Sequence, residues 1–125
     1  EDQQGGMHVA TVDGLYQFPA QGALAVECRS GDAETRGAID ALADAGATAQ
    51  ATAERQVLAT LEAGCTAPVA AYATVDGGEI TLHAGVFALD GSAQLTETAR
   101  GSDPVALGSS VAGALLERGA AQIME

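Results

Sequence analysis

Residues 68–88 read PVAAYATVDGGEITLHAGVFA, and the spacing of their apolar side chains decides the fold. Successive side chains of a β-strand point to opposite faces, so apolar residues at every second position indicate one buried face. We place the following side chains inward: Val69, Ala71, Ala73 and Val75, then Ile80, Leu82, Ala84, Val86 and Ala88. Between the two runs, Asp76-Gly77-Gly78 is typical of a hairpin turn. The sequence therefore predicts antiparallel strands at 68–75 and 79–88.

A third strand is predicted near 93–100, after a second turn at Asp90-Gly91-Ser92. Its Thr and Glu side chains make it more polar than the hairpin, which favours a position at the edge of the sheet. The predicted sheet therefore has three strands and one apolar face that other elements must cover.

Two helices that flank the strands in the sequence supply this cover. The first is predicted over 48–62, followed by Gly64 as a C-cap, and its apolar stripe is Ala53, Val57, Leu58 and Leu61. The second has Asp103 as its N-cap and Pro104 at its first position, and its stripe is Leu107, Val111, Ala114 and Leu115. Gly119 ends this helix, and residues 120–124 form one more short turn. The fold class is α+β, a three-stranded antiparallel sheet with helices on one face.

The segment that precedes this unit does not fit the same sheet. Residues 23–28 are nearly all apolar, which predicts a strand covered on both faces, and a helix over 33–44 follows, capped by Asp32 and ended by Gly46. A strand buried on both faces needs a larger sheet than this chain can build. We therefore expect a strand-helix segment at 23–45 that belongs to a mostly missing α/β domain. Residues 1–22 are then a linker and the end of a preceding domain, and 46–125 the C-terminal domain.

Composition excludes several classes of function. The chain has 125 residues with five Arg, no Lys and 17 acidic residues, a formal charge of −12. A free-standing nucleic-acid binder needs a basic surface, and an anionic membrane repels such a chain. No stretch reaches the roughly 20 apolar residues that span a bilayer. The two Cys favour a reducing cytoplasm over a disulfide framework. The polar beginning, without Met or a signal-peptide pattern, favours a fragment or a processed chain.

Two stretches resemble one protein family. Residues 19–29 read PAQGALAVECR, and residues 53–55 (AER) are followed at 61–69 by LEAGCTAPV. They resemble the Gln-Gly-Ala-(apolar)-Glu-Cys-Arg and Leu-Glu-Gly-Gly-Cys-x-x-Pro segments of the porphobilinogen deaminase (hydroxymethylbilane synthase) family. The chain departs from the family at Ala63, where the first of two glycines is usual, and at Ala20, where Gly often precedes Gln21. Alanine is tolerated there at negative φ and costly at positive φ.

The resemblance implies a three-domain transferase of tetrapyrrole biosynthesis. Such an enzyme deaminates porphobilinogen, joins four units head to tail and releases hydroxymethylbilane. The chain grows on a dipyrromethane cofactor that a thioether holds to the Cys matching Cys65. By the same resemblance, 23–45 returns to the first domain and 46–125 is the cofactor-carrying domain. The catalytic acid is expected in the missing N-terminal part, so we expect no catalytic residue in this chain and no turnover by this fragment alone.

Each candidate residue also has a plainer interpretation. A lone Cys65 is usually a half-buried hydrophobe, and the motif around it is what favours cofactor attachment. Gln21 and Gly22 either contact bound pyrroles or simply form a turn. Arg29 and Arg55 either grip pyrrole carboxylates or make internal ion pairs, and for Arg55 we expect a structural bond across a domain interface. Cys28 is expected to pack in a core.

Other functions remain open on the sequence alone. His8 and His83 have no Cys or carboxylate at ligand spacing, so a zinc site is not expected. The main alternative to the enzyme is a non-catalytic interaction module that kept the fold and lost the chemistry. A thiol-redox module is a weaker third, because Cys65 follows a helix C-terminus, whose dipole disfavours a thiolate.

Overall fold

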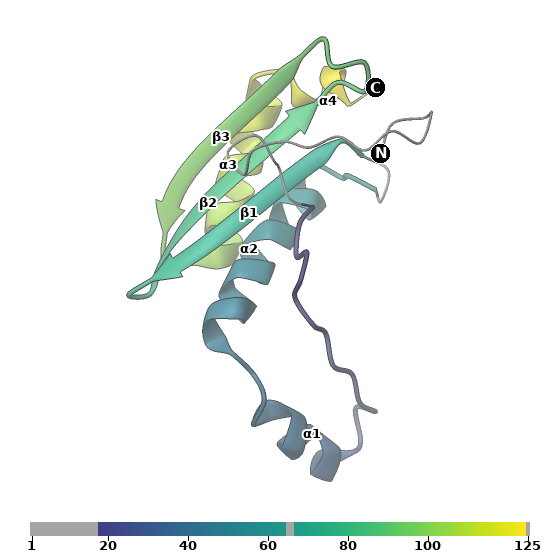
Figure 1. Cartoon of the computed structure of the whole chain (residues 1–125), viewed down its shortest axis with the longest axis vertical. Helices are drawn as coiled ribbons and strands as arrows, with labels where there is room; N and C mark the ends of the chain where they lie inside the picture. The colour runs from purple at the N-terminus through teal and green to yellow at the C-terminus, as the bar shows by residue number, and fades with distance from the viewer. Residues whose placement is uncertain (1–17, 65–66, 125) are drawn as a thin grey trace, which may run out of the picture.

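The computed structural model describes residues 18–64 and 67–124. The elements follow in the order α1 (Ala33–Asp40), α2 (Ala45–Thr60), β1 (Val69–Asp76), β2 (Glu79–Phe87), β3 (Gln94–Gly101), α3 (Pro104–Glu117) and α4 (Ala120–Ile123). The strands form one antiparallel sheet in the order β1-β2-β3, and α2 and α3 run across its face (Figure 1). This arrangement confirms the predicted α+β class.

The hairpin between β1 and β2 forms as the alternating pattern predicts. Asp76 pairs with Glu79 at its tip, and Val69 pairs with Val86 at its far end. Gly77 and Gly78 have φ angles of 56° and 88°, the left-handed conformation that a two-residue hairpin turn requires at both central positions. Each strand lies within one residue of its predicted bounds, so the register that buries the apolar face is the expected one.

The third strand lies at an edge, as its polar composition predicts. Leu82 of β2 pairs with Ala99 and Val86 pairs with Leu95, while Thr96, Thr98 and Arg100, which point to the opposite face of β3, are exposed. Gly119 beyond α3 has a φ of 94°, which confirms the predicted helix stop.

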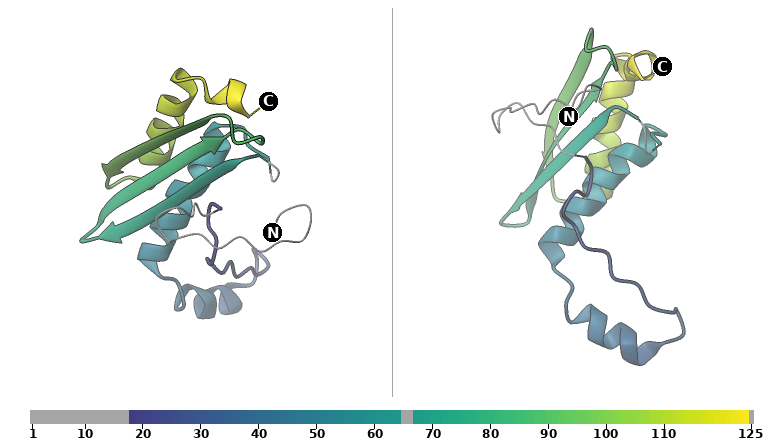
Figure 2. Two further views of the ribbon diagram at one scale, coloured as in Figure 1. Left: turned by 45° about the horizontal axis from the view of Figure 1, so that its top comes forward. Right: turned by 45° about the vertical axis from the view of Figure 1, so that its right-hand side comes forward.

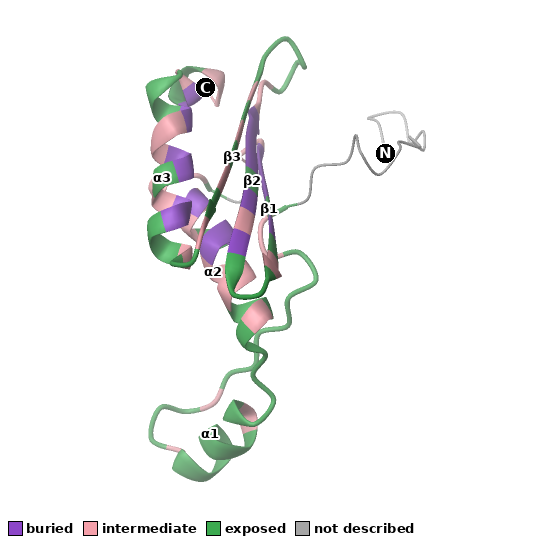
Figure 3. Cartoon of the chain, turned by 90° about the vertical axis from the view of Figure 1, so that its left-hand side faces the viewer, coloured by how far each residue is buried: buried purple, intermediate pink, exposed green. Residues whose placement is uncertain are grey.

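The core lies between the sheet and the two long helices, whose buried residues face the strands (Figure 3). Its largest fully buried side chains are Ile80, Leu82, Leu115, Val57, Val86 and Val111. Gly108 marks a close approach of α3 to α2: a Cβ there would lie 2.6 Å from the carbonyl oxygen of Ala53. Ala114, predicted on the buried stripe, is only half-buried, whereas Gly108 and Ala112, which were not predicted there, are buried.

The boundary between the first two helices differs from the prediction. Helix α1 ends at Asp40 and not at 44, and Asp44 is the N-cap of α2, where its side chain accepts a 2.7 Å hydrogen bond from the Ala47 amide. Gly46 therefore lies in the first turn of α2 and does not end α1. Asp44 caps α2 in the same way that Asp32 caps α1: each side chain accepts a hydrogen bond from the amide three residues later.

The strand predicted at 23–28 is not formed. These residues make no strand, and Leu24 keeps 95% of its surface exposed. A strand needs a hydrogen-bonding neighbour, and within the described residues the segment runs away from the sheet toward α1, which has no buried residue (Figures 1 and 2). Cys28 is accordingly half-buried and outside the core, contrary to expectation.

Within residues 18–64 and 67–124, no helix combines the length and the apolar character that crossing a membrane requires. Their His, Cys, Asp and Glu side chains also form no group of three or more that could hold a metal ion.

Candidate functional site

Cys65 lies outside the described residues, but both of its flanks are placed. Gly64, after α2, is exposed, and Ala67 and Pro68, before β1, are half-buried. The Ala67 amide donates a 3.0 Å hydrogen bond to the Gly64 carbonyl, so the two flanks lie against each other. The motif around Cys65 therefore sits at the end of the domain where α2 gives way to the sheet.

The end of α2 shows how the chain tolerates Ala63. Glu62 has a φ of 53°, its amide bonds the Ala59 carbonyl, and the Ala63 amide bonds the Leu58 carbonyl at 3.0 Å. These two bonds make a Schellman cap in which Glu62, not the predicted Gly64, takes the left-handed position. Ala63 is not among the described residues with positive φ, so Ala in place of Gly brings no backbone strain there.

Gln21 and Gly22 form a tight exposed turn. The Gln21 amide donates to the Phe18 carbonyl and the Ala23 amide to the Ala20 carbonyl, each at 3.1 Å. Ala20 has a φ of 59° and Gly22 a φ of 84°. The departure at Ala20 thus falls where the backbone is left-handed, a conformation that strains a residue with a Cβ.

Glu54 holds this turn to the domain, and sequence reasoning missed it. Its side chain is buried, with the residue 7% exposed. One carboxylate oxygen accepts a 2.6 Å hydrogen bond from the Ala20 amide, and the other accepts a 2.7 Å bond from the Ala73 amide of β1. The available signal was its position: Glu54 stands four and seven residues before Leu58 and Leu61, on the apolar side of α2.

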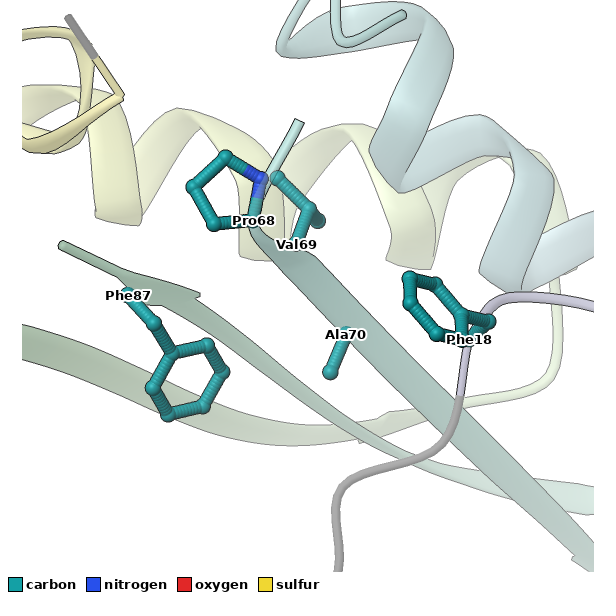
Figure 4. Close-up of a pocket in the computed structure, with 5 residues that line it drawn as sticks. All are labelled: Phe18, Pro68, Val69, Ala70 and Phe87. Carbon is teal, nitrogen blue, oxygen red and sulfur yellow. The ribbon is translucent and has the colours of Figure 1, made fainter. Parts of the chain in front are cut away.

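An apolar pocket of about 240 Å³ lies beside the start of β1. It is lined by Phe18, Pro68, Val69, Ala70 and Phe87, and the two phenyl rings stand on opposite sides of the strand (Figure 4). The Phe87 amide donates a 2.9 Å hydrogen bond to the Pro68 carbonyl, which attaches the residue before β1 to the end of β2. With no charged side chain in its lining, the pocket suits packing of apolar groups better than binding of an acidic ligand.

A larger open groove of about 910 Å³ separates residues 20–26 from α1 and α2. Gly22 and Arg55 both line it, so the structure brings one residue of the predicted turn and one predicted Arg to the same groove, whereas Gln21 is not in the lining. Arg29 is exposed and does not line the groove. His83 is exposed and shares a 2.9 Å hydrogen bond with Thr98, while His8 lies outside the described residues.

Comparisons with known proteins agree on one family. Residues 48–117 match the family model for the C-terminal domain of porphobilinogen deaminase. The chain is 50% identical over 127 residues to the porphobilinogen deaminase of Corynebacterium glutamicum (strain R), covering 98% of this chain and 42% of the relative. It is 53% identical over 108 residues to that of Corynebacterium diphtheriae, covering 85% of this chain and 37% of the relative.

A relative from another genus gives the same result. The porphobilinogen deaminase of Mycobacterium avium (strain 104) is 48% identical over 121 residues, covering 88% of this chain and 38% of the relative. The chain thus spans about two fifths of the length of the curated relatives it matches. The matched region contains α3, all three strands and nearly all of α2. The chain therefore belongs to the porphobilinogen deaminase family.

Proposed function

We propose that this chain is the C-terminal part of a hydroxymethylbilane synthase, a transferase that deaminates porphobilinogen and joins four units into hydroxymethylbilane. We further propose that Cys65 carries the dipyrromethane cofactor through a thioether. The observation that carries the proposal is the family match over the α+β domain together with the LEAGCTAPV motif between α2 and β1.

The residue type at position 65 suits this attachment. Loss of ammonia from porphobilinogen leaves an electrophilic methylene carbon, and a thiol sulfur bonds to it while the thiol proton is released. A thioether has no acidic proton and is a poor leaving group, so the primer survives many turnovers. Gly64 is exposed, so the end of α2 reaches the surface where a two-ring group has room. When bound, the cofactor supplies the pyrrole carbon to which substrate units are added.

The chain itself carries too little positive charge to run the reaction. It has five Arg and no Lys against 17 acidic residues, whereas a chain of pyrroles bears many carboxylates. Stabilising cationic intermediates also requires a fixed carboxylate near the reacting carbon. We therefore assign the catalytic acid and most of the carboxylate-binding residues to the three fifths of the relatives that this chain does not cover. The fragment alone is expected not to turn over.

The turn at Gln21 and Gly22 is proposed to contact bound pyrroles. The turn is exposed, Gly22 lines the large groove, and Arg55 lines the same groove with a charge that attracts carboxylates. We propose that 23–45 belongs to the first domain of the full-length protein and 46–125 to the cofactor-carrying domain. The exposed Leu24 and Leu42 support this, because another domain would cover them. The low cysteine content favours the cytoplasm.

Intact-mass spectrometry of the full-length holoprotein tests the proposal. We expect a two-pyrrole adduct that Cys65→Ser abolishes and the matched control Cys28→Ser retains. An unmodified Cys65 in a full-length protein that still makes hydroxymethylbilane would overturn the assignment. A protein without adduct and without turnover would favour the interaction module, and a reversible disulfide or sulfenate at Cys65 the redox module.

A further inference from the structure

We infer that Glu54 is a positioning residue that fixes the Gln21–Gly22 turn to the cofactor-carrying domain. The inference rests on the proposed function, because it concerns how that function's two candidate elements are held together. It is independent of any contact that Glu54 itself makes with a ligand.

The geometry of Glu54 joins three elements at one carboxylate. The residue lies on α2, one oxygen bonds the Ala20 amide before the turn, and the other bonds the Ala73 amide of β1. Both bonds are short and charge-assisted, and the side chain is buried, so water competes for them weakly. A carboxylate is the side chain that this site requires, because both donors are N–H groups and each needs an acceptor.

The strain at Ala20 indicates that the surroundings impose this turn. A φ of 59° is rare for alanine, so an isolated turn would favour another conformation. Strained residues persist where neighbouring contacts over-determine them, and they concentrate at functional sites. Among the described contacts, the Ala20–Glu54 bond ties this segment to α2, while Phe18 lines the apolar pocket beside Ala70 but remains 67% exposed.

The consequence is a fixed relation between the turn and β1. Gln21 and Gly22 follow Ala20 directly, and Val69, the first residue of β1, follows Cys65 by four positions in the sequence. Glu54 therefore sets the position of the Gln21–Gly22 turn relative to β1, the strand that follows Cys65 in the sequence. A misplacement of about 1 Å is enough to lower turnover strongly when two reacting groups must meet.

The first test is made on the isotope-labelled chain. A scalar coupling from the Ala20 amide nitrogen to the Glu54 Cδ is expected, because it passes through the hydrogen bond. In Glu54→Gln only one amide keeps an oxygen acceptor, so we expect Ala20 amide exchange to quicken at least tenfold and the Gln21 and Gly22 signals to shift. Glu117→Gln, the same change on the exposed face of α3, should leave them in place.

The second test is kinetic and uses the full-length holoenzyme. Per mole of cofactor adduct, Glu54→Gln should lower kcat/KM for porphobilinogen at least tenfold, whereas Glu117→Gln should match the parent protein. A purely structural role would reduce the amount of folded, adduct-bearing enzyme and leave kcat/KM per adduct unchanged. That result, or a missing Ala20–Glu54 coupling in the folded chain, overturns the inference.

The two proposals fail in different ways. A parent enzyme without adduct and turnover refutes the proposed function, while the scalar coupling still decides whether Glu54 holds the turn. If Glu54→Gln does not fold, the coupling in the parent chain and the kinetics of Glu54→Asp decide the inference. The shorter Asp side chain keeps the charge but cannot reach both amides. The same tenfold loss in kcat/KM per mole of adduct is therefore expected.

Discussion

Glu54 and Ala20 lie 34 residues apart, yet the carboxylate of the first accepts a 2.6 Å hydrogen bond from the backbone amide of the second. This bond crosses from α2 to the segment that precedes 23–45, so it ties the proposed substrate turn to the α+β domain. It also holds Ala20 at a φ of 59°, where a glycine would be unstrained.

Ala20→Gly is therefore expected to stabilise the chain. Left-handed φ costs an L-residue about 1–2 kcal/mol, which glycine would relieve. The greater flexibility of glycine in the unfolded chain opposes this gain by about 0.5–1 kcal/mol. The net gain in unfolding free energy should be about 0.5–1 kcal/mol, measured by urea denaturation.

Ala63→Gly is the matched control for this prediction. Ala63 also stands where the family favours glycine, but it lacks positive φ and packs against the core. Its replacement should lower the unfolding free energy by about 1 kcal/mol, through chain entropy and a lost methyl contact. If both variants shift stability in the same direction, backbone strain at Ala20 is not the cause.

Much of the fold was predictable because its signals are local. The hairpin follows from a period of two and a Gly-Gly turn, and α3 follows from Asp103, Pro104 and a stripe of apolar residues. The boundary between α1 and α2 was missed because Asp44 and Gly46 both carry plausible signals, and only the side-chain bond to the Ala47 amide decides between them.

The parts that could not be predicted depend on contacts distant in sequence. The strand expected at 23–28 requires a neighbouring strand, and the described part of the chain offers none beside it. Glu54 bonds amides 34 and 19 residues away, and no local pattern shows which amides lack a partner. The Cys65 motif was found through family resemblance, and the structure describes only its flanks, at the end of α2 and the start of β1.

Arg118 is expected to contribute modestly to stability, and more than Arg100 does. Its guanidinium lies 3.0 Å from the Glu97 carboxylate and donates a 2.8 Å bond to the Thr96 carbonyl, which joins the end of α3 to β3. Because the side chain is 47% exposed, Arg118→Ala should cost only about 0.5 kcal/mol, and less at high salt.

Arg100 supplies the comparison for this pair. It lies 3.7 Å from Glu79, and both side chains are more than half exposed. Arg100→Ala should therefore leave the midpoint of thermal unfolding nearly unchanged. An equal loss from both variants would show that overall charge, and not the local contact of Arg118, sets the effect.

Helix α1 should lose helicity in acid through its cap. The Thr35 amide, followed by the Thr35 hydroxyl, lowers the pKa of Asp32 below its ordinary value of 3.8. A lowered folded-state pKa means that the cap's contribution is present above pH 3.8 and is lost as the pH falls through the lower value. Because α1 has no buried residue to hold it, its Cα chemical shifts should move toward coil values in that range. Asn also caps a helix but does not titrate, so the α1 Cα shifts of Asp32→Asn should stay constant over that pH range. If the variant loses helicity as the parent chain does, another group than Asp32 causes the transition.

Gly108 and Gly113 make the sharpest test of how α2 and α3 pack, because one helix holds both. A Cβ at Gly108 would lie 2.6 Å from the Ala53 carbonyl oxygen and 2.6 Å from the Gln56 Cβ, and the first of these is backbone that cannot rotate away. Gly108→Ala must therefore push the helices apart, at a cost of about 2 kcal/mol. At Gly113 nothing lies within 4 Å of a new Cβ, so Gly113→Ala should gain about 1 kcal/mol from helix propensity. The two variants should therefore change the unfolding free energy, measured by urea denaturation, in opposite directions if the helices touch at Gly108. A gain in stability from both variants would contradict the close crossing.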